Sequence, residues 1–240
     1  MRLFNKTNLP LSDINRLKNE VHIYYASLNV DPGKLDFLKQ KLSLDEIERA
    51  EKFKFKKDHD SYVHSRGLLR IILSSYLDIE NSELHFNYNS FGKPEIRGID
   101  FNLSHSKGMV IYGFTLGREI GIDIEKILPK ENSQEIVERF FSEAEKEDYN
   151  NLPHYLKIKA FWHCWTRKEA YMKAHGRGLN LPLNQFSVSL LPEKDIKLVH
   201  KKDGIDEGVK WTIKDLKVND QFAAALAYKG NEVPLFCRQI

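Results

Sequence analysis

The order of predicted elements repeats along this 240-residue chain, and that repetition limits the folds open to it more than any other feature. Each half reads as a strand, an acidic helix, a long helix and a further strand. The matching pairs are HIYYASL with GIDIEKI, residues 43–55 with FSEAEKEDY, SRGLLRIIL with TRKEAYMKA, and VIYGFTL with FAAALAY. The likeness lies in element order rather than in residue identity. It predicts two α+β halves that meet near Gly117, and clefts between such halves are common ligand sites.

Hydrophobic periodicity and capping signals give the bounds of these elements. Ser43 and Glu46 predict a capping box at the start of a helix over 42–55. Gly176 and Gly178 end a helix that starts near residue 154. Further helices are predicted over 58–77 and about 134–149, a turn over 90–94, and strands over 21–28, 83–89, 99–106, 108–116, 120–125, 185–190, 209–216 and 221–229.

The composition excludes several classes of protein. The polar residues and proline of MRLFNKTNLP interrupt any secretory segment at the N-terminus, and no apolar run approaches the length of a membrane helix. The net charge of +3 does not suggest a nucleic-acid binder. Cys164 and Cys237 lack the spacing of a zinc site, and Cys164 reads as a core residue. We therefore expect a cytoplasmic protein without membrane or nucleic-acid partners.

A strand with two carboxylates is the first candidate for chemistry. In IGIDIE, three isoleucines occupy one face, while Gly121, Asp123 and Glu125 occupy the other. Side chains two residues apart on a strand lie about 7 Å apart. Two carboxylates at that spacing suit a shared cation. On its own, however, the pattern is more often a half-exposed strand with an acidic outer face.

The helix near WTRKEAYMKA carries the second candidate. Lys168 and Glu169 fall within the wedge formed by aromatic and other apolar side chains, where a solvated ion pair would not be placed. Charged groups among aromatic rings need partners that offset their desolvation. Glu169 and Lys173 have the spacing of a helical ion pair, so a purely structural bridge is an equal alternative.

Together these residues suit a divalent cation and a polyphosphate. Mg²⁺ prefers oxygen ligands and keeps positions free for water and substrate phosphates. Ser104 and His105 end a predicted strand beside a turn, where His105 could donate to a phosphate oxygen. Lys93 lies in the turn FGKP and could do the same. A lone histidine is usually structural, and Lys93 alone reads more often as an ordinary exposed turn lysine.

The order of these motifs resembles that of the 4′-phosphopantetheinyl transferases of the surfactin-synthetase-activating type. The matching segments are FGKPEI with FNLSHS, then IGIDIEKI, then RFFSEAEKEDY, then WTRKEAYMKAHGRGL. They span about residues 90–180, and a weaker helical match over 42–70 extends the likeness toward the N-terminus. Each motif alone is modest, whereas four motifs in the same order form a specific signal.

The resemblance implies a fold and a reaction. The fold is α+β, with two similar halves, 1–117 and 118–240, related by a pseudo-twofold axis, each a small mainly antiparallel sheet packed against helices. The monomer would hold its active site between the halves. It would transfer the 4′-phosphopantetheine arm of coenzyme A, its co-substrate, to a serine of an apo acyl or peptidyl carrier protein. Adenosine 3′,5′-bisphosphate would leave, with Mg²⁺, or Mn²⁺ in its place, as the cofactor.

The resemblance also implies roles for individual residues. It implies metal binding by Asp123, Glu125 and Glu169, and less firmly by Glu145. Catalytic roles fall to Glu169 as a candidate base, to Lys173 beside the leaving group, and to His105. Coenzyme A would be bound by a larger basic and polar set, namely Arg49, Lys52, Arg66, Lys93, Ser104, His105, Lys168 and Lys173.

One position departs from the family pattern. The first basic residue expected to grip the 3′-phosphate of coenzyme A is replaced by Glu46, which leaves that contact to Arg49, Lys52 and Arg66, or to Lys54, Lys56 or Lys57. Two other functions use similar carboxylates: a Mg²⁺-dependent phosphohydrolase or nuclease, and a carrier-binding homologue without activity. The ordered motifs count against the first, and the presence of the complete set of charged residues counts against the second.

Overall fold

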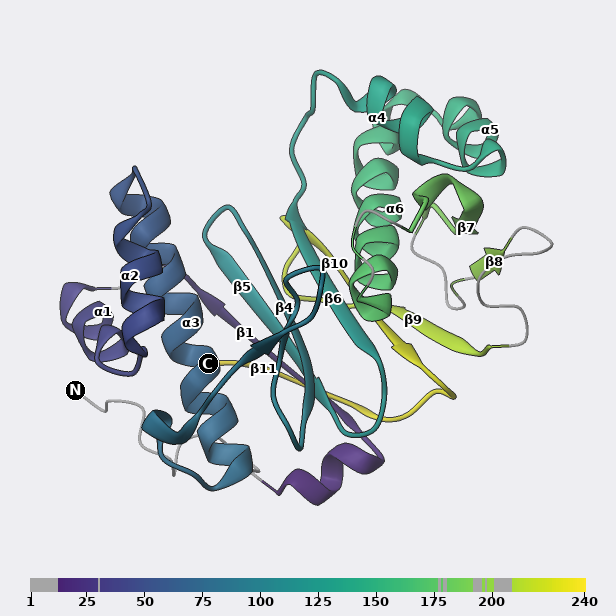
Figure 1. Cartoon of the computed structure of the whole chain (residues 1–240). Coiled ribbons are helices and arrows are strands. Elements are labelled where there is room, and N and C mark those ends of the chain that lie inside the picture. The colour runs from purple at the N-terminus through teal and green to yellow at the C-terminus, as the bar shows by residue number, and fades with distance from the viewer. Residues whose placement is uncertain are drawn as a thin grey trace.

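The computed structural model describes residues 13–29, 31–176, 178, 181–191, 196, 198–200 and 209–240 (Figure 1). The helices are α1 (Pro32–Lys39), α2 (Leu44–Glu51), α3 (Lys56–Leu77), α4 (Ser133–Phe140), α5 (Glu143–Asn151) and α6 (His154–His175). The strands are β1 (Val21–Ser27), β2 (Asn87–Tyr88), β3 (Pro94–Glu95), β4 (Asp100–Ser106), β5 (Met109–Thr115), β6 (Ile120–Lys126), β7 (Phe186–Val188), β8 (Leu198–His200), β9 (Trp211–Asp215), β10 (Phe222–Lys229) and β11 (Leu235–Gln239). The expectation that no secretory segment is present concerns residues 1–12, which lie outside the described residues.

Two main sheets confirm the predicted α+β class. One sheet has the strand order β11-β1-β5-β4, and the other has the order β6-β10-β9. All neighbouring strands in them are antiparallel except β1 and β11. Figure 1 shows α3 beside the first sheet and α6 beside the second. Among the described residues, no helix is both long and apolar enough to cross a membrane.

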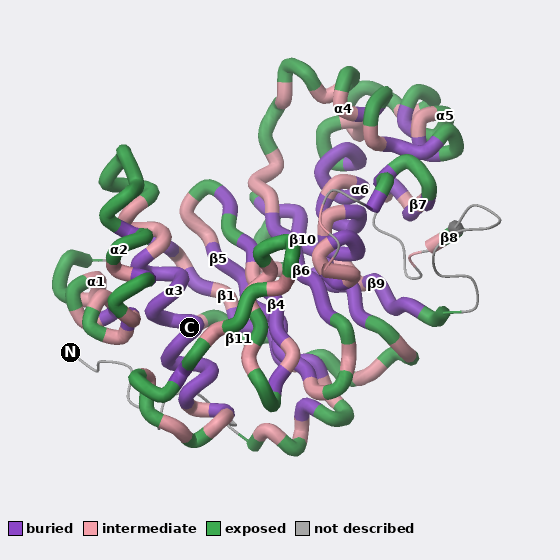
Figure 2. Tube along the Cα trace, viewed as in Figure 1, coloured by how far each residue is buried: buried purple, intermediate pink, exposed green. Residues whose placement is uncertain are grey.

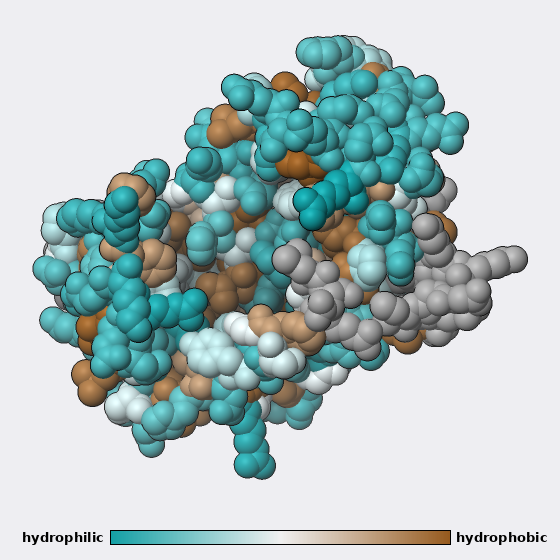
Figure 3. Space-filling view, turned by 45° about the horizontal axis from the view of Figure 1, so that its top comes forward, coloured by the Kyte–Doolittle hydropathy of each residue, from teal (hydrophilic) through white to brown (hydrophobic). Residues whose placement is uncertain are grey.

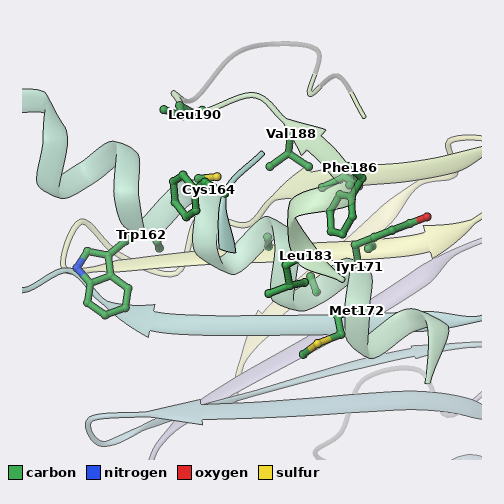
Figure 4. Close-up of a cluster of buried hydrophobic side chains, with 14 of the residues drawn as sticks. Trp162, Cys164, Tyr171, Met172, Leu183, Phe186, Val188 and Leu190 are labelled. Atoms are coloured by element: carbon green, nitrogen blue, oxygen red, sulfur yellow. The ribbon is translucent and has the colours of Figure 1, made fainter. Parts of the chain in front are cut away.

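Alternating side chains produce apolar layers on both faces of these sheets. Even-numbered β1 residues such as Tyr24 pack with α3, whereas odd-numbered ones such as Ile23 pack with Ile122 of β6 and Leu226 of β10. The two sheets therefore share a buried layer, and most residues of β5, β6 and β10 are buried (Figure 2). A third cluster packs around α6 and includes Trp162, Cys164, Tyr171, Met172, Leu183, Phe186, Val188 and Leu190 (Figure 4). Cys164 is a free, buried core residue, as predicted.

Strand β6 approaches β4 without a backbone ladder between the described residues of the two strands. The amide of Ile122 instead donates to Asn102 Oδ1 of β4 over 2.9 Å. Two serines of β4 donate to carboxylates of β6, as given below. Side chains thus join the two strands in place of a ladder, and Asn102 satisfies one amide on the free edge of β6. We call this line of contact between β4 and β6 the seam.

Helix α6 lies directly on β6 at Gly121. A Cβ atom added there would lie 2.1 Å from the carbonyl oxygen of Ala170 and 2.2 Å from the amide nitrogen of Ala174. No residue other than glycine fits such a distance without moving the helix. The glycine of IGIDIE therefore sets how closely α6 approaches the strand that carries the two carboxylates.

Several predicted bounds are wrong in detail. The single helix over 134–149 is two helices, because Ser142 starts a second capping box with Glu145. The predicted strand over 83–89 contains only the short β2, and β11 was not predicted at all. The capping box of Ser43 and Glu46 and the helix end at Gly176, with φ +66°, are confirmed.

Candidate active site

A pocket opens on the seam where β4, β6 and α6 meet. It is lined by Leu103, Ser104, His105, Asp123, Glu125, Trp165, Glu169 and Lys173. In Figure 3 the molecular surface is hollowed between the helices of the first half, at the left, and the α4–α5 region, at the top. Six of the sequence-predicted site residues are therefore brought together from the three elements β4, β6 and α6.

The local structure explains this convergence. Asp123 and Glu125 follow Gly121 on the face of β6 that turns toward α6, because strand side chains alternate. Glu169 and Lys173 lie one turn apart on α6, on the side that meets this face. The close contact at Gly121 holds the two sets of charges together.

The ammonium group of Lys173 contacts two other residues that line the pocket. Its Nζ atom lies 2.6 Å from Asp123 Oδ1 and donates to Ser104 Oγ over 3.0 Å. Ser104 Oγ in turn donates to the same Asp123 oxygen over 2.7 Å. Asp123 Oδ2 is buried and has no hydrogen-bond partner within the described part of the chain. A buried carboxylate oxygen without a partner is costly, so this atom points to a missing ligand.

The pKa values of the other two carboxyl groups, Glu169 and Glu125, are raised. Burial raises the pKa of Glu169 to about 7, and the nearby negative charge of Asp123 adds to this effect while Lys173 opposes it. Burial also raises the pKa of Glu125, although Ser106 Oγ donates to its Oε2 atom over 2.6 Å and opposes the rise. Mutual repulsion between carboxylates contributes to both shifts.

This set of donors fits a hard divalent cation in its chemistry. Three carboxylates face one pocket, and one of them has a buried oxygen without a partner among the residues that the structure describes. Oxygen ligands of this kind are those that Mg²⁺ prefers. Within the described residues, no three Asp, Glu, His or Cys side chains are already arranged to hold a metal ion. Lys173 instead supplies the positive charge beside Asp123.

The structure does not place Lys168 or Glu145 in this pocket, which corrects two predictions. Lys168 is fully buried, lies 2.7 Å from Glu145 Oε2, and donates to the carbonyl oxygens of Leu183 and Phe186. Glu145 also accepts from the amides of Ser142 and Val188. Because these partners use both oxygens and the ammonium group, neither residue is available to a metal or to coenzyme A. The prediction that buried charges on this helix need partners is confirmed.

Some of the basic residues predicted to bind the 3′-phosphate of coenzyme A have partners within the protein. Arg66 is buried, and its Nε atom lies 2.5 Å from Glu46 Oε1 while its Nη2 atom donates to Tyr88. Two of the guanidinium nitrogens of Arg66 therefore have partners within the protein, and its contact with the 3′-phosphate stays a prediction. Arg49 is exposed and lies over the ring of Tyr62. Tyr62 and His105 line a second pocket next to the first, so Arg49 stays close to the predicted site.

The remaining predicted contacts lie around the pocket. His105 is exposed at the end of β4 and faces both pockets. Lys52 is exposed beyond the end of α2. Lys93 is half-buried, and its Nζ atom donates to two carbonyl oxygens, those of Ile120 and Lys173.

Sequence reasoning missed the residues that hold the site together. Asn102 and Ser106 form hydrogen bonds with β6, and Gly121 allows α6 to approach β6 closely. A signal for the first two exists, because Asn102, Ser104 and Ser106 alternate along β4 and so point to one side. The partner strand on that side could not be read from the pattern.

Comparison with known proteins identifies two matching regions. Residues 119–227 match the model of the 4′-phosphopantetheinyl transferase superfamily, and residues 30–113 match that of the 4′-phosphopantetheinyl transferase N-terminal region. The 4′-phosphopantetheinyl transferase HetI of Nostoc sp. is 34% identical over 224 residues, 91% of each chain. The 4′-phosphopantetheinyl transferase Sfp of Bacillus subtilis is 33% identical over 184 residues, 72% of this chain and 81% of its own.

Proposed function

Since this chain belongs to the 4′-phosphopantetheinyl transferase superfamily, we propose that the pocket on the seam is its active site. The chain transfers the 4′-phosphopantetheine arm of coenzyme A to a serine of an apo carrier protein, and adenosine 3′,5′-bisphosphate leaves. The observation that supports this placement best is Asp123 Oδ2, which is buried in a pocket with two further carboxylates and one ammonium group. This oxygen has no partner in the described ranges of the chain.

We assign Asp123, Glu125 and Glu169 as the residues that would hold Mg²⁺. The bound ion would neutralise negative charge on the pyrophosphate of coenzyme A. Ser104 and His105 lie beside these carboxylates and are proposed to contact the phosphates, with Arg49 and Lys52 nearer the 3′-phosphate. For phosphoryl-type transfer of this kind, positioning and charge stabilisation provide most of the catalysis.

Residues of the chain itself accept the proton of the carrier serine and neutralise the negative charge on the departing bisphosphate. The carrier serine Oγ bonds to the β-phosphorus of coenzyme A, and the bond from that phosphorus to the bridging oxygen of the departing bisphosphate breaks. Glu169 accepts the serine proton, directly or through a water. The ammonium group of Lys173 neutralises charge on the leaving phosphate.

Four finer assignments remain proposals. We propose that the chain is of the surfactin-synthetase-activating type, which its 33% identity to Sfp supports. We propose a monomer, because one chain supplies every side of the pocket, and we keep the sequence-based expectation of a cytoplasmic location. The division at Gly117 with a pseudo-twofold relation also stays a prediction. Strand β11 qualifies that division, because it comes from the second half and pairs with β1 of the first.

Intact-mass analysis tests the proposed function. Purified chain, coenzyme A, Mg²⁺ and an apo carrier protein are incubated, and the carrier should gain the mass of one phosphopantetheine arm. Asp123→Asn should abolish the gain and leave the fold intact, because it keeps the shape of the side chain and removes its charge. Transfer at the wild-type rate in Asp123→Asn would refute the assignment of the pocket.

Glu145→Gln is the matched control for that variant. It replaces another buried carboxylate of the same half, one that pairs with Lys168 and does not line the pocket. The capping contact with Ser142 can persist through the amide oxygen. Transfer per folded molecule should therefore equal that of the wild type. A loss of transfer as large as that of Asp123→Asn would show that general destabilisation, rather than the pocket, explains both results.

A further inference from the structure

The hairpin of β2 and β3 bridges the two halves of the molecule beside the pocket. On one side, Tyr88 of the hairpin accepts a hydrogen bond from Arg66 of α3 over 2.7 Å. On the other, Asn89 Nδ2 donates to the carbonyl oxygen of Gly176, directly after α6, over 3.1 Å. The hairpin also carries Lys93, whose contacts reach further into the second half.

Lys93 joins the two elements that carry the charged site residues. Its Nζ atom lies 2.9 Å from the carbonyl oxygen of Ile120, the first residue of β6, and 2.9 Å from that of Lys173 in the last turn of α6. Carbonyls in the last turn of a helix lack part of their intrahelical bonding, and a cation there is favourable. The carbonyl of Ile120 lies on the free edge of β6, where Asn102 satisfies the amide of Ile122.

We propose that Lys93 is a positioning residue, which fixes the end of α6 against the start of β6 and thereby sets the spacing of the catalytic charges. The proposal rests on the proposed function. Glu169 and Lys173 belong to α6, whereas Asp123 and Glu125 belong to β6, so any sliding of the two elements changes every distance in the pocket. Gly121 limits how close the elements come, and Lys93 limits how far they separate.

This role differs from the phosphate contact that the sequence suggested for Lys93. An ammonium group has three N–H donors, and two of them are used by carbonyl oxygens here. Both acceptors are main-chain atoms, so the side chain is held in place before any substrate binds. Loss of the amine should therefore affect the geometry of the pocket more than the binding of coenzyme A.

The test uses Lys93→Met, which keeps the length of the side chain and removes its charge, with Ser90→Ala at the exposed tip of the same hairpin as the control. Amide hydrogen exchange of the last turn of α6 should accelerate by at least about tenfold in Lys93→Met, because two charge-assisted hydrogen bonds are lost. Exchange in β1 should not change. In transfer assays, kcat should fall about tenfold, while KM for coenzyme A stays near that of the wild type.

Each other outcome overturns the proposal in a distinct way. Unchanged exchange with a raised KM for coenzyme A would identify Lys93 as a phosphate contact. Accelerated exchange with an unchanged kcat per folded molecule would identify it as purely structural. If the wild-type chain modifies no carrier, the proposed function fails. In that event, the exchange result still decides whether Lys93 holds α6 to β6.

Discussion

Gly121→Ala tests the contact on which the geometry of the pocket depends. The added Cβ atom would lie 2.1 Å and 2.2 Å from backbone atoms of Ala170 and Ala174 in α6. These atoms belong to a hydrogen-bonded helix and cannot rotate away, so the helix must move by about 1.3 Å to restore ordinary contact. Overpacking of this kind costs typically about 1–3 kcal/mol, and we expect a value near the upper end because backbone meets backbone.

The consequence should be measurable in both stability and activity. A loss of about 3 kcal/mol in a chain of this size corresponds to a fall in Tm of about 6–12 °C, which circular dichroism can follow. Because the shift separates Glu169 and Lys173 from Asp123 and Glu125, transfer by the molecules that remain folded should also fall, by about a hundredfold. Intact-mass assays well below the Tm measure this second effect.

Gly113→Ala is the matched control. Gly113 lies on β5, and its added Cβ atom would meet the Cδ1 atoms of Ile120, Ile122 and Leu226 at 3.1 Å, 3.5 Å and 3.6 Å. These are the flexible ends of side chains, so we expect a cost below about 1 kcal/mol. Both variants lower the entropy of the unfolded chain equally, and that effect cancels in the comparison. A Tm of Gly121→Ala equal to that of Gly113→Ala would refute the reasoning.

Three further predictions concern buried titratable side chains. Lys168→Met leaves Glu145 as an unpaired buried charge, so the free energy of unfolding in urea should fall by about 3–5 kcal/mol, while transfer per folded molecule is unchanged. Because the pKa of Glu169 is raised to about 7, calorimetry should show Mg²⁺ affinity that increases as the pH rises through neutrality, and Glu169→Gln should lose this dependence. Burial, with a smaller effect of Lys34, lowers the pKa of His64 from 6.5 to about 4. The unfolded chain then binds a proton that the folded chain does not, so stability in urea should be full above pH 6.5 and should fall toward pH 4, with a smaller slope in His64→Gln.

Local patterns predicted the elements well where the signal lies within one segment. The capping box of Ser43 and Glu46 starts α2, and the strand IGIDIE is β6 with its carboxylates on one face. These features depend on neighbours a few residues away, which the sequence displays directly. The convergence of β6 and α6 was expected from the family resemblance, because no local pattern predicts which strand a helix covers.

Two of the failures have a long-range cause, and the third, the division of the helix at Ser142, is local. Strand β11, near the C-terminus, pairs with β1, more than 200 residues earlier. No hydrophobic periodicity within a segment predicts such a distant partner. Ser142 divides the predicted helix over 134–149, because the capping bonds with Glu145 replace the helical ones at that point. Glu46 was noted as a departure from the expected basic residue, but its two arginine partners lie on α3 and became visible only in the fold.

Lys168 and Lys173, both on α6, explain why a charge pattern alone could not separate structure from function. Lys168 and Lys173 each contact a buried carboxylate, Glu145 and Asp123 respectively. Both oxygens of Glu145 have partners in the protein, so that pair is complete and serves packing alone. Asp123 has partners on Oδ1 and none on Oδ2 among the described residues, so its pair still lacks a ligand. Since an unsatisfied buried oxygen lowers stability, its presence is best explained by a bound species that supplies the missing partner.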